Sequence, residues 1–423
     1  CNLSFRIKFI ITLRIRRLVK KIIYVSFISF ASSFLYSQQG CTDPLANNYV
    51  SSASINDGSC VYNLTNYTME SVANLDSPIL NENSGIVFFD NHLYTINDGG
   101  NSNSIFEMDT LGAIIREITV VNATNVDWEA LSHNNQSVFI GDFGNNSGSR
   151  EDLCIYEISK QDILDPQATE VSATKRLFRL QDQVDFTWNS NSHNYDCEAF
   201  VSTDDSLYLF SKNWLDEETK LYRLPNTWSD TAVAVLDNGF NVDGLITDAS
   251  VDLISGNIML LGYKNNGANL YSSFIWMLWD YEDNVFFSGN KRRFEIGTMF
   301  SLAQTEGLAL KDNSTGYVSS EQISSVITIA PKLFKFNLSD YLQQEPLSVG
   351  SIESVPSTAY PNPGRDFLTI ENLNGHYFIY ELSTLKLVSS GELISNRVNI
   401  SKLNAGTYFI QVDELKIKFK KSN

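Results

Sequence analysis

The sequence has little of the chemistry that marks the commonest metal and nucleophile sites. Only five cysteines and four histidines occur among 423 residues, with no C-x-x-C pair and no Cys/His cluster. Because zinc sites are built from closely spaced Cys and His ligands, we do not expect one. The G-x-S-x-G turn is missing as well, which argues against a Ser-His-Asp hydrolase.

Positive charge and long apolar runs are also scarce. Lys and Arg number 31 against 49 Asp and Glu, a net charge of −18, so nucleic acid is not expected as a partner. The apolar stretch Ile22–Tyr36 follows a basic segment and is shorter than the roughly 20 residues that span a bilayer. It predicts a secretory signal peptide over residues 1–37, with a membrane anchor as the alternative. After its cleavage we expect no membrane span.

The abundant residues are those that form strands. Phe (26) and Tyr (19) are frequent, while long helical periodicities are hard to find, so the fold class is predicted to be all-β. Changes in composition divide the chain into five segments. These are a signal peptide (1–37), a small module (38–62), a large repeat region (63–342), a linker (343–358) and a C-terminal domain (359–423).

The small module reads "GCTDPLANNYVSSASINDGSCVY" from residue 40. It resembles a short module of cell-surface proteins in bacteria that use type IX secretion. Turn formers dominate it and apolar surface is almost absent, so a Cys41–Cys60 disulfide is needed to hold it. The sequence leaves open whether the two remaining cysteines of the exported chain, Cys154 and Cys197, pair.

The C-terminal segment contains "YPNPGRDFLTI", alternating strands, "LNAGTYFIQV" and a lysine-rich end. Period-2 strands separated by turns predict a small Ig-like β-sandwich. The same motifs resemble the C-terminal sorting domain of type IX secretion, which implies that machinery as a partner and delivery to the cell surface or the medium. The motif residues are Tyr360, Pro361, Asn362, Pro363, Gly406 and Tyr408.

The middle region repeats one pattern five times. An acidic or small polar residue precedes Gly or Ala, and two apolar strands around a polar turn follow, as in "DWEALSHNNQSVFIGDF" and "QTEGLALKDNSTGYVSSE". Such self-similar strand units predict a β-propeller of five or six blades, with a two-sheet sandwich as the alternative. The fifth repeat lacks a fourth strand, which Asn66–Leu75 would supply. The aligned positions are Ser84, Glu129, Glu198, Asp243 and Glu306.

This alignment predicts a ring of carboxylates facing the central funnel. Carboxylates packed together repel one another unless a cation neutralises them, and Ca²⁺ is the natural choice for oxygen ligands. The candidate metal ligands are Glu129, Glu198, Asp243 and Glu306, and the alternative is that each acid caps its own loop or pairs with a lysine. Candidates for ligand binding around the ring are Asp98, Asp142, Lys212, Lys264 and Glu321.

The repeats are also similar to secreted propellers related to esterase-like phytases and gluconolactonases, a resemblance that implies metals in an acidic funnel. Two functions follow as expectations. One is a calcium-stabilised module that binds a small molecule, a glycan or a protein, as in adhesion. The other is a metal-dependent hydrolase of a phosphoester, ester or lactone, with Glu129 and Glu306 as catalytic candidates. The sequence does not decide whether the chain is an enzyme, and we expect a monomer.

Overall fold

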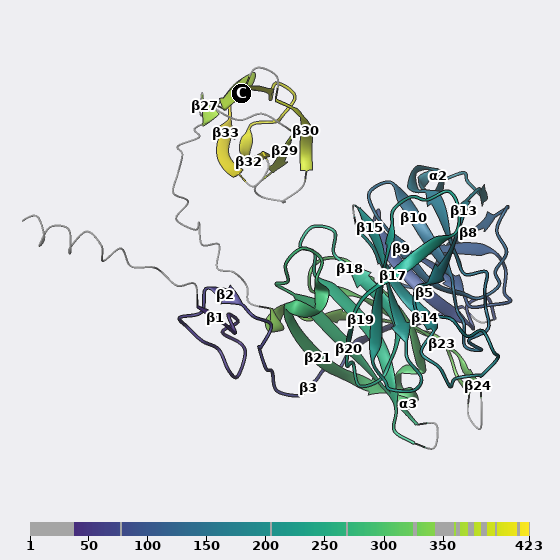
Figure 1. The fold of residues 1–423 in the computed structure, drawn as a ribbon. Coiled ribbons are helices and arrows are strands. Elements are labelled where there is room, and N and C mark those ends of the chain that lie inside the picture. Colours follow the sequence, from purple (N-terminus) through teal and green to yellow (C-terminus); the bar gives the residue numbers. More distant parts are fainter. Residues whose placement is uncertain are drawn as a thin grey trace, which may run out of the picture. The chain divides into compact units, whose positions relative to one another are not determined.

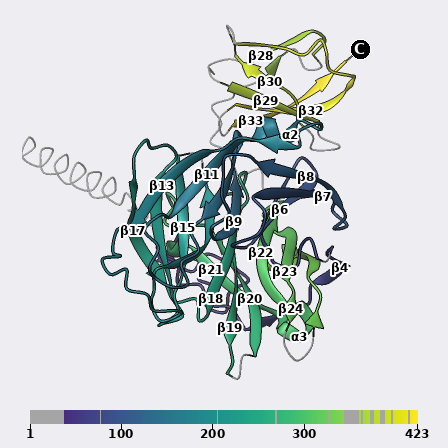
Figure 2. The same ribbon diagram turned by 90° about the vertical axis from the view of Figure 1, so that its right-hand side faces the viewer.

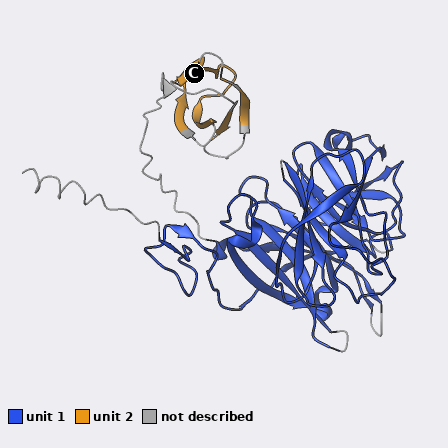
Figure 3. Ribbon diagram, viewed as in Figure 1, with its two compact units in different colours: residues 1–344 blue, residues 345–423 orange. Residues whose placement is uncertain are grey.

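The computed structural model describes residues 38–342, apart from 77, 204, 268–269 and 325–327, together with parts of residues 359–422. The gaps in the latter range are 361–363, 371–375, 382–386, 394–395 and 413–414. The predicted signal peptide (1–37) and linker (343–358) lie outside the described residues. The chain divides into two compact units, residues 1–344 and 345–423 (Figure 3), and each is considered by itself.

The first unit is built from four-stranded antiparallel blades that surround a common axis (Figures 1 and 2). Their innermost strands touch in a closed cycle, each one contacting the next and the fifth returning to the first. The part of the chain that the structure describes therefore forms a five-bladed propeller, so the predicted all-β propeller is confirmed with five blades rather than six. The long spacings between some repeats are occupied by loops rather than by another blade.

The strands of each blade follow one another from the axis outward. The first three blades are β5 (Asn83–Phe89), β6 (His92–Asn97), β7 (Ser104–Met108) and β8 (Ile114–Val120); β9 (Trp128–His133), β10 (Ser137–Asp142), β11 (Cys154–Ser159) and β13 (Thr174–Leu180); and β14 (Asp196–Ser202), β15 (Ser206–Lys212), β16 (Thr219–Pro225) and β17 (Ala232–Phe240). The last two are β18 (Leu245–Val251), β19 (Ile258–Asn265), β20 (Tyr271–Trp279) and β21 (Asn290–Thr298); and β22 (Gln304–Leu310), β23 (Thr315–Glu321), β26 (Lys332–Asn337) and β4 (Glu70–Asn74).

The ring is closed by a strand from the other end of the unit. β4 precedes the first blade in the sequence, yet it pairs antiparallel with β26 as the outer strand of the fifth blade. This confirms the prediction that the segment around Asn66–Leu75 supplies the missing strand. Both ends of the propeller sequence thus share one sheet, and the backbone ladder between them holds the ring shut.

The outer blade edges are mostly covered. β13 and β17 pair in parallel, which joins the second and third blades into one eight-stranded sheet. The short strands β12 (Glu170–Val171) and β3 (Thr65–Asn66) pair in parallel with β8 and β21 respectively. Because an unpaired edge is a template for aggregation, this cover limits pairing with other chains.

The remaining short elements decorate the blades. They are the helices α2 (Lys160–Leu164) and α3 (Met299–Leu302), the 3₁₀ turns η1 (Phe286–Ser288) and η2 (Ser339–Tyr341), and the short strands β1 (Gln39–Gly40), β2 (Ile55–Asn56), β24 (Ile323–Ser324) and β25 (Thr328–Ile329). Among the described residues, no helix is long and apolar enough to cross a membrane.

The small module docks on the fourth blade and carries the Cys41–Cys60 disulfide. Asn56 donates hydrogen bonds to the side chains of Asp280 (2.8 Å) and Asn290 (3.0 Å). The Tyr62 ring packs on Trp279, with centroids 5.6 Å apart. With no core of its own, the module relies on the disulfide and on this contact with the blade. Cys154 and Cys197 are buried and free.

The second unit is a β-sandwich. One sheet contains β27 (Ala359–Tyr360), β28 (Phe367–Ile370) and β31 (Arg397–Asn399), and the other contains β30 (Leu387–Glu392), β29 (His376–Glu381), β32 (Gly406–Val412) and β33 (Leu415–Lys421). Inward residues of both sheets form one core. Gly406 opens β32, and the buried Tyr408 donates a hydrogen bond from its hydroxyl to the Asn404 carbonyl (2.9 Å). Pro361, Asn362 and Pro363 lie outside the described residues.

Close approach of the innermost strands requires small residues near the axis. A Cβ atom on Gly85 would lie 2.4 Å from the backbone nitrogen of Leu131, and one on Gly307 would lie 2.6 Å from the carbonyl oxygen of Ser84. Asp248 in β18 spans this crowded region, because its carboxylate accepts the backbone N–H groups of Ala249 (2.8 Å) and Leu308 (2.7 Å). The blades are therefore held together by backbone contact as well as by apolar packing.

We predict that Gly85→Ala lowers the free energy of unfolding by more than about 2 kcal/mol, because its Cβ meets backbone rather than a movable side chain. Gly239→Ala in the outer strand β17 is the matched control, since its Cβ would meet only the Thr219 carbonyl oxygen, at 3.2 Å. We expect that variant to stay within about 1 kcal/mol of the parent. Urea unfolding of the two variants measures both effects, and equal losses would contradict the close approach at the axis.

Candidate functional site

Every innermost strand carries an irregularity at the same place. In β9, β14, β18 and β22, one residue is skipped in the pairing with the neighbouring strand, and in β5 the skipped segment includes Ser84 and Gly85. A β-bulge leaves its extra residue unpaired and turns that side chain in a new direction. The bulged residues are Ser84, Glu129, Glu198, Thr247 and Glu306.

This register corrects the alignment of the fourth repeat. Thr247, and not Asp243, occupies the bulge of β18. Asp243 precedes the strand in the left-handed region (φ 53°) and its side chain is 60% exposed. It forms an ion pair with Lys264, which also lies 3.5 Å from Glu217. The sequence "VDGLI" resembles the repeat pattern, but its Asp-Gly pair forms a bend directly before β18.

Four of the five bulged residues line one cavity of ≈ 160 Å³ at the end of the axis. Its walls are mostly polar, and the aromatic rings of Trp214 and Tyr263 form one side. The residues that line it are Ser84, Asp98, Glu129, Asn146, Glu198, Lys212, Trp214, Tyr263, Gln304, Glu306 and Glu321. The predicted residues Asp142, Asp243 and Lys264 are not among them.

One acid of the ring is already neutralised. Glu198 and Lys212 are buried and form an ion pair, and the ammonium lies over the rings of Trp214 (5.0 Å) and Tyr263 (5.3 Å). Burial alone would lower the pKa of Lys212, but the carboxylates of Glu198 and Glu306 raise it, so the lysine stays charged. Lys212 therefore supplies a positive charge within the cavity. For Glu198 this agrees with the alternative considered from the sequence, in which an acid of the ring pairs with a lysine.

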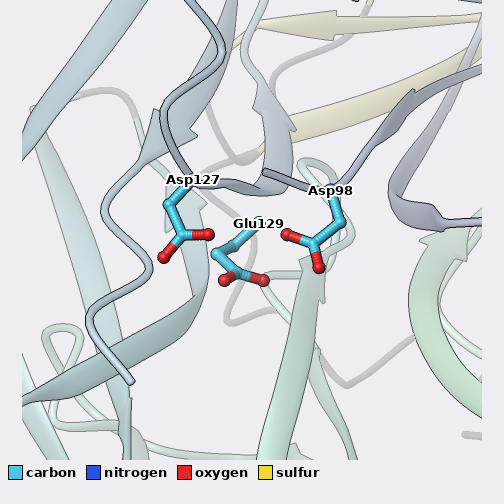
Figure 4. Close-up of side chains that lie close together, drawn as sticks. All are labelled: Asp98, Asp127 and Glu129. Atoms are coloured by element: carbon cyan, nitrogen blue, oxygen red, sulfur yellow. The ribbon is translucent and has the colours of Figure 1, made fainter. Parts of the chain in front are cut away.

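A second group of acids has no such partner. Oxygens of Asp98, Asp127 and Glu129 all lie within 4.8 Å of one another, and Figure 4 shows the three carboxylates turned toward a common point. Asp98 follows β6, while Asp127 and Glu129 flank and enter β9, so two blades contribute. Among the described residues, no hydrogen bond or ion pair reaches the carboxylate of Asp127 or Glu129, although Glu129 is only 6% exposed. The Asp98 carboxylate accepts the backbone N–H of Gly99, but no cation of the described residues forms an ion pair with any of the three acids.

Two glycines make room for this cluster. A Cβ on Gly99 would lie 2.4 Å from Oδ1 of Asp127, and a Cβ on Gly144 would lie 2.2 Å from Oε1 of Glu129. Asp142 holds the segment before β9 in place, since its carboxylate accepts the backbone N–H of Asp127 (3.1 Å) and forms an ion pair with Arg150 (2.9 Å). The glycine-rich stretches "INDGG" and "GDFGNN" thus shape the walls around carboxylates.

Burial and charge repulsion both raise the pKa values of the acids in this cluster. Burial, followed by the neighbouring carboxylates, raises the pKa of Glu129 well above its ordinary value and that of Asp127 to about 7. Burial likewise raises the pKa of Asp98. Each acid therefore resists ionisation while its neighbours are charged, which is the condition that a bound cation would relieve.

The fifth blade contributes two more acids. Glu306 accepts a hydrogen bond from Gln304 (2.6 Å), and burial raises its pKa to about 7 against the opposing effect of Lys212. Glu321 ends β23, and its carboxylate has no hydrogen-bond or ion-pair partner among the described residues. Burial, together with the charges of Glu306 and Asp98, raises its pKa to about 9. Both line the cavity as acids with raised pKa values.

The C-terminal unit matches a known family. A family model, the secretion system C-terminal sorting domain, covers residues 358–422. This identifies the chain as a protein handled by the type IX secretion machinery and delivered to the cell surface or outside. The comparison with curated proteins finds no match.

Solved structures similar to the chain have sequences about 10% identical to it. A GH62 α-L-arabinofuranosidase of Coprinopsis cinerea is 11% identical (TM-score 0.37, 64% of this chain and 98% of that one). An exo-β-1,3-galactanase of Clostridium thermocellum is 9% identical (TM-score 0.37, 85% of this chain and 86% of that one). A putative 6-phosphogluconolactonase of Bacteroides uniformis is 10% identical (TM-score 0.29, 78% of this chain and 88% of that one). Likenesses with TM-scores below 0.5 do not transfer an activity to this chain.

The raised pKa of Glu321 predicts how stability depends on pH. An acid whose pKa is higher in the folded state stabilises the fold fully below its unfolded pKa of about 4.3, and this stabilisation is lost as pH rises through the folded pKa. We therefore expect the metal-free protein to lose stability between about pH 5 and 9. In Glu321→Gln this loss should be smaller by at least about 1 kcal/mol, since one pKa unit corresponds to about 1.4 kcal/mol.

Urea unfolding at pH 6 and pH 9 in a chelating buffer tests this prediction. Glu218→Gln removes an exposed carboxylate that does not line the cavity and serves as the control. A pH profile of Glu321→Gln that matches the parent and the control would contradict it.

Proposed function

We propose that this exported propeller binds Ca²⁺ through Asp98, Asp127 and Glu129, and that the loaded funnel binds a ligand presented at the cell surface or in the medium. The observation that carries the proposal is the convergence of three carboxylates from two blades within 4.8 Å. One of them belongs to the buried Glu129, whose carboxylate has no other partner among the described residues. Of the four metal ligands predicted from the sequence, this proposal keeps Glu129 and adds Asp98 and Asp127.

The cluster fits the requirements of calcium. The ion binds oxygen ligands at 2.3–2.6 Å, so two ligand oxygens on one ion lie at most about 5 Å apart, which a spread of 4.8 Å satisfies. Carboxylates can also bind through both oxygens, and the high coordination number of calcium leaves positions for water or for a ligand. Gly99 and Gly144 keep side-chain atoms out of this space.

The cavity that Asp98 and Glu129 line suits a small polar group. Its ≈ 160 Å³ falls below the roughly 300–1,000 Å³ of a pocket that encloses a whole ligand. It would therefore hold one end of a larger molecule, with the charged Lys212 as a donor and Trp214 as an apolar wall. A calcium-dependent binding or adhesion module is the function that this arrangement supports best.

Calcium should raise the melting temperature of the protein, and a chelator should reverse the effect. Asp127→Asn and Glu129→Gln should each weaken calcium binding in a calorimetric titration by at least about tenfold, as expected for the loss of a charged ligand. Without calcium, Glu129→Gln should melt at or above the temperature of the parent, because the substitution removes repulsion from a crowded site.

Asp243→Asn is the matched control. Asp243 belonged to the predicted ring but does not line the cavity. The affinity of the Asp243→Asn variant for calcium should therefore stay within about twofold of the parent. No calcium binding by the parent, or an equal loss in Asp243→Asn and Asp127→Asn, would overturn the proposal.

A hydrolase is the second candidate function, favoured by Glu306 and Glu321. A carboxyl group that keeps its proton near neutral pH can donate it to a leaving group, while an ionised acid in the same cavity can accept a proton from water. A calcium ion in the cluster would supply polarisation of a substrate oxygen. The substrate classes with suitable leaving groups are phosphoesters, esters, lactones and glycosides.

A panel of chromogenic substrates from these four classes tests this candidate. Glu306→Gln or Glu321→Gln should lower kcat/KM by about 10²-fold or more, as expected for the loss of a general acid. The control Glu218→Gln should leave the rate unchanged. Turnover that persists in Glu306→Gln/Glu321→Gln, or no turnover of any substrate by the calcium-loaded parent, would exclude this role.

A further inference from the structure

A second cavity, of ≈ 470 Å³, lies beside the funnel, and no residue of the proposed metal site lines it. It is formed by the loop between β13 and β14 (residues 181–195), with contributions from the loop after β10 and from the segment after β15. Its walls include Trp188, Asn189, His193, Asn194, Tyr195 and Leu215. Its volume lies within the range of about 300–1,000 Å³ that ligand pockets occupy.

The cavity presents apolar surface to solvent. Trp188 is 70% exposed and Leu215 is 66% exposed, and both line the same space. Tyr195 adds a second aromatic ring, stacked on His193 with an interplanar angle of 9°. Large apolar side chains that are exposed together in a concave site, rather than scattered singly, mark a binding surface.

The loop that carries Trp188 is fixed on both sides of this residue. The backbone N–H groups of Asn189 and Asn191 donate to the carbonyls of Ser147 (2.8 Å) and Asn146 (2.9 Å). Before Trp188, the Gln183 side chain donates to the Gly148 carbonyl (2.9 Å). The backbone is thus pinned to the second blade while the indole stays in solvent, so a ligand would meet a pre-positioned ring and lose little affinity to ordering.

The charged groups of the cavity are already engaged. Lys220 is bound to Asp182 (2.6 Å), and Asp185 accepts the backbone N–H of Thr187 (2.9 Å). The other polar groups that line the space are the amides of Asn189 and Asn194 and the hydroxyl of Ser192. Each already donates one hydrogen bond within the protein, and each keeps a second amide hydrogen or a hydroxyl lone pair for a ligand. Among the described lining residues, an anion would find no unpaired cation, whereas a neutral polyhydroxy ligand would find apolar faces and neutral hydrogen-bonding groups.

The cavity also adjoins the funnel. His193 donates a hydrogen bond from Nε2 to the carbonyl of Asn146 (3.1 Å), a residue of the funnel wall, and accepts the N–H of Tyr195 at Nδ1 (3.1 Å). Trp214 lines the funnel and its neighbour Leu215 lines the second cavity. The two sites are therefore consecutive along one face of the propeller.

From these observations we infer that the cavity around Trp188 binds a neutral oligosaccharide, with a sugar ring stacked on the indole and its hydroxyls bonded to the surrounding amides. Aromatic side chains supply apolar area at a low conformational cost, and the amides fix the orientation of the ligand. The inference is independent of the calcium proposal, since none of Asp98, Asp127 and Glu129 lines this cavity.

Calorimetric titration of the exported chain with cellohexaose, xylohexaose and laminarihexaose tests the inference, in calcium and in chelator. We expect at least one of the three to bind, and Trp188→Ala to weaken that binding by at least about tenfold through the loss of stacking. Trp188→Phe keeps an aromatic ring and should stay within about threefold of the parent. Phe300→Ala removes an aromatic side chain that is 59% exposed and outside both cavities, and should bind as the parent does.

Three results would overturn the inference. They are no binding of any of the three oligosaccharides at millimolar concentration, binding that Trp188→Ala leaves unchanged, and preferential binding of a proline-rich decapeptide, which would also use exposed aromatic rings. Because Asp127→Asn leaves this cavity intact, its oligosaccharide binding should persist where its calcium response is lost. The two proposals can therefore fail separately.

Discussion

The bulge in the innermost strand of each blade is the constraint on which the binding face depends. Five strands crowd around the axis, and their backbones approach so closely at Gly85 and Gly307 that a methyl group has no room. A regular strand would alternate its side chains between the two faces of its own blade. The unpaired residue of the bulge escapes this alternation, which is how Glu129, Glu198 and Glu306 come to line one cavity.

Collecting acids in this way creates an electrostatic problem that the protein solves unequally. On the side of the third blade, Lys212 neutralises Glu198 within the protein. On the fifth blade, burial raises the pKa values of Glu306 and Glu321. On the side of the first two blades, the pKa values of Asp98, Asp127 and Glu129 are raised as well, and no cation of the described residues pairs with them. The convergence of these three carboxylates within 4.8 Å, rather than the number of acids, is what favours a cation there.

Much of this fold could be predicted from the sequence because each blade repeats a local pattern. The acid-plus-small-residue signature identified Glu129, Glu198 and Glu306, and the missing strand of the fifth repeat led to β4. Asp243 was misplaced because an Asp-Gly turn looks like the signature, while Thr247 offers no acid to recognise. Asp127 was not among the predicted ligands, because its approach to Asp98 joins loops from two blades and cannot be inferred from sequence spacing.

The cavity around Trp188 was harder to foresee for the same physical reason. The propeller contains six tryptophans, and the sequence alone does not distinguish them. Trp128, for example, is fully buried in an apolar cluster. Trp188 differs only because the loop around it is tied by backbone hydrogen bonds to residues 146–148, which holds the indole outside the core. Loop backbone bonds of this kind depend on how two blades are placed side by side. The rigid propeller therefore fixes both the carboxylate cluster and the exposed ring, and it sets them next to each other on one face.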